Sequence, residues 1–149
     1  MASILKHGGA EQKQRYLPRI ASGELRLQSI GITEPDAGSE TPRITTFARR
    51  QGDHYVINGQ KIFTSRYQHS DMLLPLTRTT PFDEVKKKTD GMSLFLVNLK
   101  ESGDAIKAVP IATMVTMGPT SFRGGLAGGR SSEERARRIR LCEGIPRRT

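Results

Sequence analysis

The sequence predicts a mainly β fold, preceded by a short helix and followed by an irregular basic tail. Short β-prone runs alternate with polar connections that contain Gly and Pro. Asn58-Gly59 separates two of these runs, as in a hairpin with a type I′ turn. With 149 residues and 35% hydrophobic content, the chain can hold one modest core.

A helix is expected ahead of the β region. Tyr16, Leu17 and Ile20 are spaced as on one face of a helix, and Gly23 follows them as a typical helix end. We therefore expect the helix to stop at Gly23 and the β region to begin shortly after it.

The first expected strand comes next. Leu27, Ile30 and Ile32 stand among polar residues, as in a half-buried strand. Residues 35–39 then end the strand with Pro, Asp, Gly and Ser. On local composition, an ordinary Pro-Asp-x-Gly turn is the favoured explanation of this segment.

The same segment also has the chemistry of a binding loop. Thr33 and Ser39 offer hydroxyl groups, and Gly38 lets the backbone approach a ligand closely. Such a loop suits a ligand rich in acceptors, such as a pyrophosphate or the edge of an isoalloxazine ring.

The next expected element is the hairpin at residues 53–63, with Asn58-Gly59 at the reversal. Beyond it, Phe63 is followed by Thr64 and Ser65, so an aromatic face stands beside two hydroxyl groups. By itself, Phe63 is more simply explained as a core aromatic.

Two further strands are expected at residues 73–76 and 92–97, with a lysine-rich loop between them. Pro75 interrupts the first of these runs with a residue that has no N–H. We therefore expect an edge position or a bulge at Pro75.

Two segments together resemble the acyl-CoA dehydrogenase family. Residues 33–40, Thr-Glu-Pro-Asp-Ala-Gly-Ser-Glu, are similar to its Thr-Glu-Pro-x-Ala-Gly-Ser-Asp motif. Residues 57–61, Ile-Asn-Gly-Gln-Lys, are similar to its Ile-Asn-Gly-x-Lys segment, in the same order along the chain. The resemblance covers about residues 4–117 and implies the family's middle, β-barrel-like domain, with FAD as cofactor.

The resemblance also implies which residues contact the cofactor. The family usually has Trp at the position of Phe63, against the flavin ring, and Thr at the position of Ser65, at the reactive N5 edge. Both substitutions keep an aromatic face and a hydroxyl donor. The implied cofactor contacts are Ile32, Thr33, Gly38, Ser39, Phe63, Thr64 and Ser65, and Ser39 is also implied near the thioester substrate.

The family's reaction is the FAD-dependent α,β-dehydrogenation of an acyl-CoA thioester. Its catalytic base is a Glu of a C-terminal helical domain that has no counterpart in this sequence, and Glu34 corresponds to a structural residue. We therefore expect a truncated chain that is inactive by itself. The implied partners are an acyl-CoA substrate, an acceptor of the electron-transfer-flavoprotein kind and further copies of the chain.

Three parts are expected along the chain. Residues 1–26 resemble the end of the family's N-terminal helical domain, residues 27–117 its middle domain, and residues 118–149 depart from it. The last part is Gly- and Arg-rich, without strand or helix period, and is expected to be disordered. Read one nucleotide later, codons for residues 138–142 can encode Gly-Phe-Ala-Tyr-Val, similar to the family, which suggests a shifted reading frame.

The net charge of +9 is concentrated in this tail. From Arg123 onward, eight Arg stand against three Glu, which gives +5 of the +9. A solvated tail is the simpler explanation, so neither a specific nucleic-acid partner nor membrane association is expected. Cys142 is the only cysteine, and the three His residues are scattered, so no metal site is expected.

Other assignments remain open at this stage. Related flavoproteins of the acyl-CoA oxidase or nitroalkane oxidase type would carry the same motifs, and a small basic protein that binds polyanions would explain the tail. The first residues hold no signal peptide and no apolar run is long enough to span a membrane. This fits a bacterial cytoplasmic protein, although the compartment is otherwise open.

Overall fold

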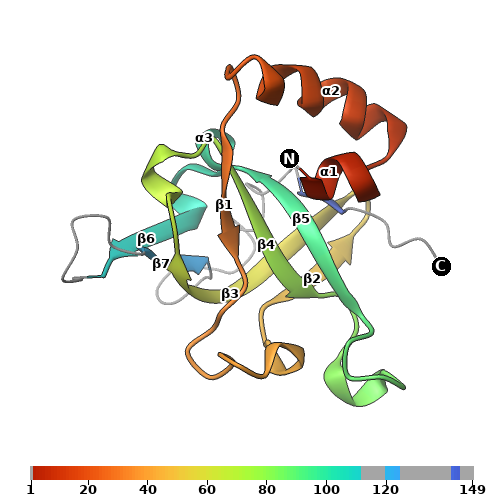
Figure 1. Ribbon diagram of the computed structural model, residues 1–149. Helices are drawn as coiled ribbons and strands as arrows, with labels where there is room; N and C mark the ends of the chain where they lie inside the picture. Colours follow the sequence, from red (N-terminus) through yellow and green to blue (C-terminus); the bar gives the residue numbers. More distant parts are fainter. Residues whose placement is uncertain (1, 112–119, 125–141, 145–149) are drawn as a thin grey trace.

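The computed structural model describes residues 2–111, 120–124 and 142–144. Two helices, α1 (Ala2–His7) and α2 (Ala10–Ala21), lie together over one side of a mixed sheet (Figure 1). At the start of α2, the side chain of Gln12 accepts a hydrogen bond from the Gly9 N–H at 3.2 Å. The helix ends at Ser22 and Gly23, where Gly23 has a φ of +80°, so the expected helix end is confirmed.

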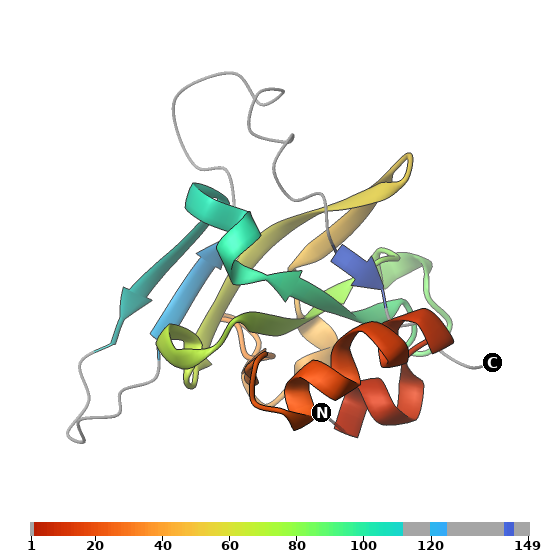
Figure 2. The same cartoon turned by 90° about the horizontal axis from the view of Figure 1, so that it is seen from above.

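Within the part of the chain that the structure describes, eight strands form the sheet. In chain order they are β1 (Leu27–Gly31), β2 (Phe47–Gln51), β3 (His54–Thr64), β4 (Met72–Arg78), β5 (Met92–Asn98), β6 (Ile106–Pro110), β7 (Thr120–Gly124) and β8 (Cys142–Gly144). The neighbours follow the order β6-β7-β3-β2-β4-β5-β8, and β1 pairs with β4 in parallel. Over the described residues this path does not close, and β6 and β7 lie at the end away from the helices (Figure 2). The prediction of a strand-rich domain behind a short helix is confirmed.

Short helical turns fill the connections. They are η1 (Thr41–Arg43), η2 (Tyr67–His69), η3 (Phe82–Glu84), α3 (Leu99–Ser102) and η4 (Gly103–Ala105). The expected strands at residues 73–76 and 92–97 are found as the inner parts of β4 and β5. Two strands, β7 and β8, fall within the stretch for which irregular structure was expected; the rest of residues 118–149 lies outside the described residues.

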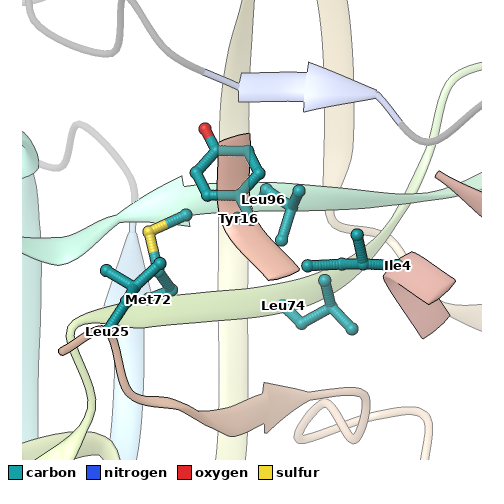
Figure 3. Packing of buried hydrophobic residues seen from close by; sticks show 6 residues of the cluster. All are labelled: Ile4, Tyr16, Leu25, Met72, Leu74 and Leu96. Carbon is teal, nitrogen blue, oxygen red and sulfur yellow. The ribbon is translucent and has the colours of Figure 1, made fainter. Parts of the chain in front are cut away.

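The helices close the main hydrophobic core against β4 and β5. Its buried members are Ile4, Tyr16, Leu25, Met72, Leu74 and Leu96 (Figure 3). A second cluster, with Leu73 and Phe95 at its centre, lies on the other face, where Tyr55 meets Phe95 edge to face at 5.0 Å. Because neighbouring residues of β4 point to opposite faces, this strand serves both clusters. That explains why its residues are apolar without alternation.

The expected turn at Asn58-Gly59 is wrong. β3 runs without a break from His54 to Thr64, and the reversal between β2 and β3 lies at Gly52-Asp53, next to the Gln51–His54 pair. Gly52 has the positive φ of +62° that such a turn needs. Gly59 is required for another reason, because a Cβ there would lie 2.6 Å from the Thr46 Cα.

The expected edge position or bulge at Pro75 is also wrong. β4 lies between β1 and β5, and its pairing with β5 keeps one register from Leu73–Val97 to Leu76–Leu94. The pairing with β1 ends where Pro75 stands opposite Gly31, so the missing N–H falls at the end of that ladder.

The side chains of β1 are placed differently from the sequence expectation. Ser29 and Gly31 face the interior, whereas Ile30 and Ile32 are exposed. The half-buried strand is therefore real, but beyond Leu27, which packs against the main core, its inner face is made of small residues. The two isoleucines are left on the surface.

Candidate functional site

The two segments that carry the family motifs lie side by side. The Ile62 N–H of β3 donates to the Thr33 carbonyl at 2.9 Å, and Lys61 Nζ donates to the Ile32 carbonyl at 3.0 Å. These bonds fasten the segment after β1 to the end of β3. The chain therefore brings together residues that lie about thirty positions apart.

A β-bulge turns Phe63 toward solvent. Between Lys61 and Thr64 the pairing of β3 with β7 shifts register, so β3 carries one residue more than its partner. Phe63 has a φ of +56°, which is rare for a bulky residue, and it is 57% exposed. Strained backbone that exposes a large aromatic side chain is a feature of functional sites.

A tight turn follows in the segment after β1. The backbone groups of Glu34 and Ala37 bond each other reciprocally, both at 3.2 Å, around Pro35-Asp36. Gly38 and Ser39 follow on the surface. The segment is therefore the turn that local composition predicts, and it follows directly on the residues that bond the end of β3; its role as a binding loop stays a prediction.

A buried ion pair lies behind this surface. Glu34 and Lys61 are 3% and 0% exposed, and Lys61 Nζ donates to Glu34 Oε1 at 2.7 Å. Glu34 also accepts from the Thr45 N–H, the Thr45 hydroxyl and the Thr46 N–H at 2.6 to 3.0 Å. Burial by itself would raise the pKa of Glu34, but these donors outweigh it and lower that pKa to about 2. Glu34 is therefore held as a carboxylate.

The predicted contact residues lie on the two segments that the Ile62–Thr33 and Lys61–Ile32 bonds join, and they differ in exposure. Ile32, Gly38, Ser39, Phe63 and Ser65 are exposed and Thr33 is half-buried. Thr64 has no exposed surface, and its hydroxyl lies close to Gly31, within van der Waals reach of a Cβ placed there.

The site residues predicted from the sequence do not include Lys61. The available signal was a pair of opposite charges, Glu34 in one motif and Lys61 in the other.

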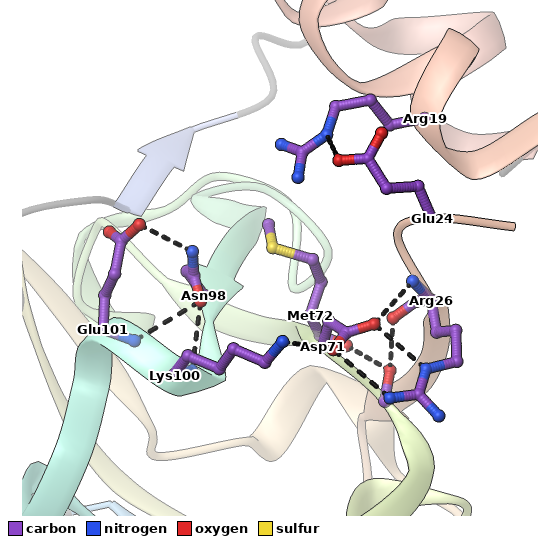
Figure 4. A network of polar contacts seen from close by, with 9 residues as sticks. Arg19, Glu24, Arg26, Asp71, Met72, Asn98, Lys100 and Glu101 are labelled. Atoms are coloured by element: carbon purple, nitrogen blue, oxygen red, sulfur yellow. Dashed lines mark hydrogen bonds and ion pairs between the residues drawn. The ribbon is translucent and has the colours of Figure 1, made fainter. Parts of the chain in front are cut away.

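A second polar network stands at the opposite end of β1 (Figure 4). Asp71 accepts from the Arg26 N–H at 2.9 Å, from Arg26 Nε at 3.1 Å and from Lys100 Nζ at 3.2 Å. Hydrogen bonds from Arg26 hold the pKa of Asp71 well below its usual range. This network joins β1, β4 and α3, away from the exposed Phe63.

Comparison with known proteins shows that this fold is the middle domain of a class of flavoenzymes. Residues 29–123 match the family model described as acyl-CoA dehydrogenase, middle domain. The acyl-CoA dehydrogenase FadE26 of Mycobacterium tuberculosis is 41% identical over 112 residues, which is 75% of this chain and 27% of that protein. The chain belongs to the acyl-CoA dehydrogenase family.

Solved structures agree. The ChsE4-ChsE5 complex from Mycobacterium tuberculosis superposes with a TM-score of 0.73 at 36% identity, over 83% of this chain and 30% of that chain. A glutaryl-CoA dehydrogenase from Mycobacterium smegmatis in complex with FADH2 gives a TM-score of 0.71 at 25% identity, over 97% and 33%. The chain spans about a quarter of the length of the curated relatives it matches.

The described part of the chain lacks two further features. No helix there is both long and apolar enough to cross a membrane. Nor do those residues contain a group of three His, Cys, Asp or Glu side chains that could hold a metal ion.

Proposed function

We propose that this chain is the FAD-contacting part of an acyl-CoA dehydrogenase. The observation that carries the proposal is the exposed Phe63 in its strained bulge, fastened beside Ile32 and Thr33. An exposed aromatic ring next to an aliphatic side chain suits a planar ring system, which gains by stacking and by exclusion of water.

The donor set fits the same cofactor. Ser65 lies on the surface two residues after Phe63, and Gly38 and Ser39 lie on the surface of the other segment. When bound, FAD would supply the hydride acceptor. Phe63 would cover one face of the ring, and the Ser65 hydroxyl would donate a hydrogen bond to the reacting edge. Thr64, which is buried, would support these two residues from beneath.

The substrate is proposed to be an acyl-CoA thioester, with Ser39 close to it. Glu34 does not fit the role of the base that removes the α proton. Its carboxylate is buried, its pKa is about 2, and its oxygens are already bonded to Lys61, Thr45 and Thr46. A general base needs to reach the proton and to have a pKa near the working pH.

FAD binding by the full 149-residue chain tests the proposal. Titration followed by flavin fluorescence should show saturable binding, and Phe63→Ala should weaken it roughly tenfold through lost stacking area. Leu5→Ala is the matched control, because Leu5 is also 57% exposed but lies on α1. Equal weakening by both substitutions, or no binding at all, would contradict the proposal.

Turnover provides a separate check. Without a base placed at the substrate, the chain alone should not reduce an artificial acceptor when acyl-CoA and FAD are supplied. Dehydrogenation under these conditions would show that a residue of this chain acts as the base. An electron-transfer-flavoprotein-like acceptor and assembly with other subunits are proposed on the family alone.

A further inference from the structure

We propose that Lys61 is a positioning residue that orients the peptide between Ile32 and Thr33, so that the Thr33 N–H faces the flavin. Glu34 holds Lys61 in place for this task. The inference rests on the proposed function, since it concerns the surface assigned there to FAD.

The burial of the Glu34–Lys61 ion pair is not explained by a gain in the free energy of unfolding. Lys61 is completely buried, and taking a charged amine out of water is costly even when it is paired. Apolar residues of similar volume often replace such pairs without loss of stability. The ammonium group of Lys61 also bonds the backbone, because Nζ donates to the Ile32 carbonyl as well as to Glu34.

The direction of one carbonyl fixes the direction of the next N–H. All described peptide bonds are trans, and in a trans peptide the C=O and N–H point to opposite sides. Because the Ile32 carbonyl points toward Lys61 of β3, the Thr33 N–H points away from that side chain. Within the described residues, no acceptor is found for this N–H.

A second bond prevents the segment from rotating. The Thr33 carbonyl accepts from the Ile62 N–H, so two successive carbonyls are turned toward β3. A regular strand would alternate them. The buried ammonium group makes this arrangement possible, since the backbone of β3 supplies a donor for only one of the two carbonyls. Lys61 supplies the other.

The ligand group that fits is an uncharged hydrogen-bond acceptor on the ring system of the flavin. An N–H that is held in direction before binding loses little entropy when it bonds an acceptor. Lys61 would therefore act on affinity through Thr33 and without touching the cofactor.

The test is the double variant Glu34→Gln/Lys61→Met in the full chain. It removes both charges together, so no unpaired charge is left buried, and the chain should remain folded. Arg26→Met/Asp71→Asn is the matched control, because it removes an ion pair at the other end of β1.

Two measurements are made on each variant. Amide hydrogen exchange by NMR should rise roughly tenfold at residues 34 and 37, whose N–H groups are bonded in the turn, in the Glu34/Lys61 variant, while the β2–β3 hairpin keeps its protection. The Kd for FAD should rise roughly tenfold, as expected for loss of one oriented donor. The control should leave both quantities unchanged.

The results distinguish failure of the positioning role of Lys61 from failure of the proposed function. Unchanged exchange at residues 34 and 37, or an unchanged Kd in the Glu34/Lys61 variant, would overturn the positioning role and leave the proposed function standing. Equal effects in the control would also overturn it, because any loss of an ion pair would then suffice. If the unmodified chain does not bind FAD, the proposed function fails, and with it the flavin-facing role of Thr33.

Discussion

The two ends of β1 are each fastened by a carboxylate and basic side chains, but they differ in contact with water. At the Arg26 end, Asp71 is paired with Arg26 and Lys100, whose side chains are 54% and 80% exposed. At the Gly31 end, Glu34 and Lys61 are both buried, and their remaining bonds are with backbone groups and the Thr45 hydroxyl.

The difference teaches that the same ion-pair chemistry can serve two purposes. Asp71 is buried, but its partners Arg26 and Lys100 are exposed, so water and salt screen the two pairs by which it joins three elements. The buried pair is not screened, and breaking it on one side leaves a charge with no partner. The buried pair lies directly behind the surface proposed to contact FAD.

The largest expected effect follows from removing Lys61 alone. Lys61→Met leaves the Glu34 carboxylate buried without its ammonium partner and should lower the free energy of unfolding by about 3–5 kcal/mol. Urea unfolding at pH 7 measures this change. Lys107→Met on the exposed face of β6 is the control and should cost less than about 0.5 kcal/mol. Similar losses in both variants would remove the distinction between buried and exposed lysines.

Acid should weaken the Glu34 end in a defined pH range. The pKa of Glu34 is about 2 in the folded chain, against an ordinary value of 4.5. A lowered folded pKa stabilises the fold above the ordinary value, and this contribution is lost as pH falls from about 4.5 toward 2. Urea unfolding at several pH values should show the loss, and Glu34→Gln should reduce it. A variant with the same acid dependence as the parent chain would contradict the assignment.

The Asp71 end should respond less to a comparable change. Asp71→Asn keeps an acceptor for the Arg26 N–H but removes the charge, so we expect a loss of about 1–2 kcal/mol in the free energy of unfolding. The measurement is the same urea titration. A loss as large as that of Lys61→Met would show that exposure of the partners does not decide the strength of the two sites.

The smallest expected effect is at Lys100. Because its side chain is 80% exposed, Lys100→Ala should cost less than about 1 kcal/mol, and high salt should reduce the difference further. Unfolding with and without 1 M NaCl, where the screening length is about 3 Å, measures this. A salt-independent loss would indicate that the aliphatic stem of Lys100, and not its charge, stabilises α3.

Much of the fold follows from local sequence. The helix end at Gly23 and the strands β4 and β5 are predictable because they depend on residues close together in the chain. The family motifs also point to the two segments of the candidate site, because each motif is a short continuous run of residues. The domain limits at residues 26 and 117 and the individual cofactor contacts stay predictions.

The tertiary structure alone decided the environments of Gly59, Phe63 and Lys61, because these environments depend on contacts between distant segments. Gly59 looked like a turn residue, but it is required by the approach of Thr46 from another part of the chain. Phe63 looked like a core aromatic, and a bulge against β7 places it on the surface instead. Lys61 is a charged residue in a β-prone run, and its burial depends on Glu34, which lies 27 positions earlier. Sequence determines what each residue can do locally, while burial and pairing are set by whichever distant groups the fold brings against it.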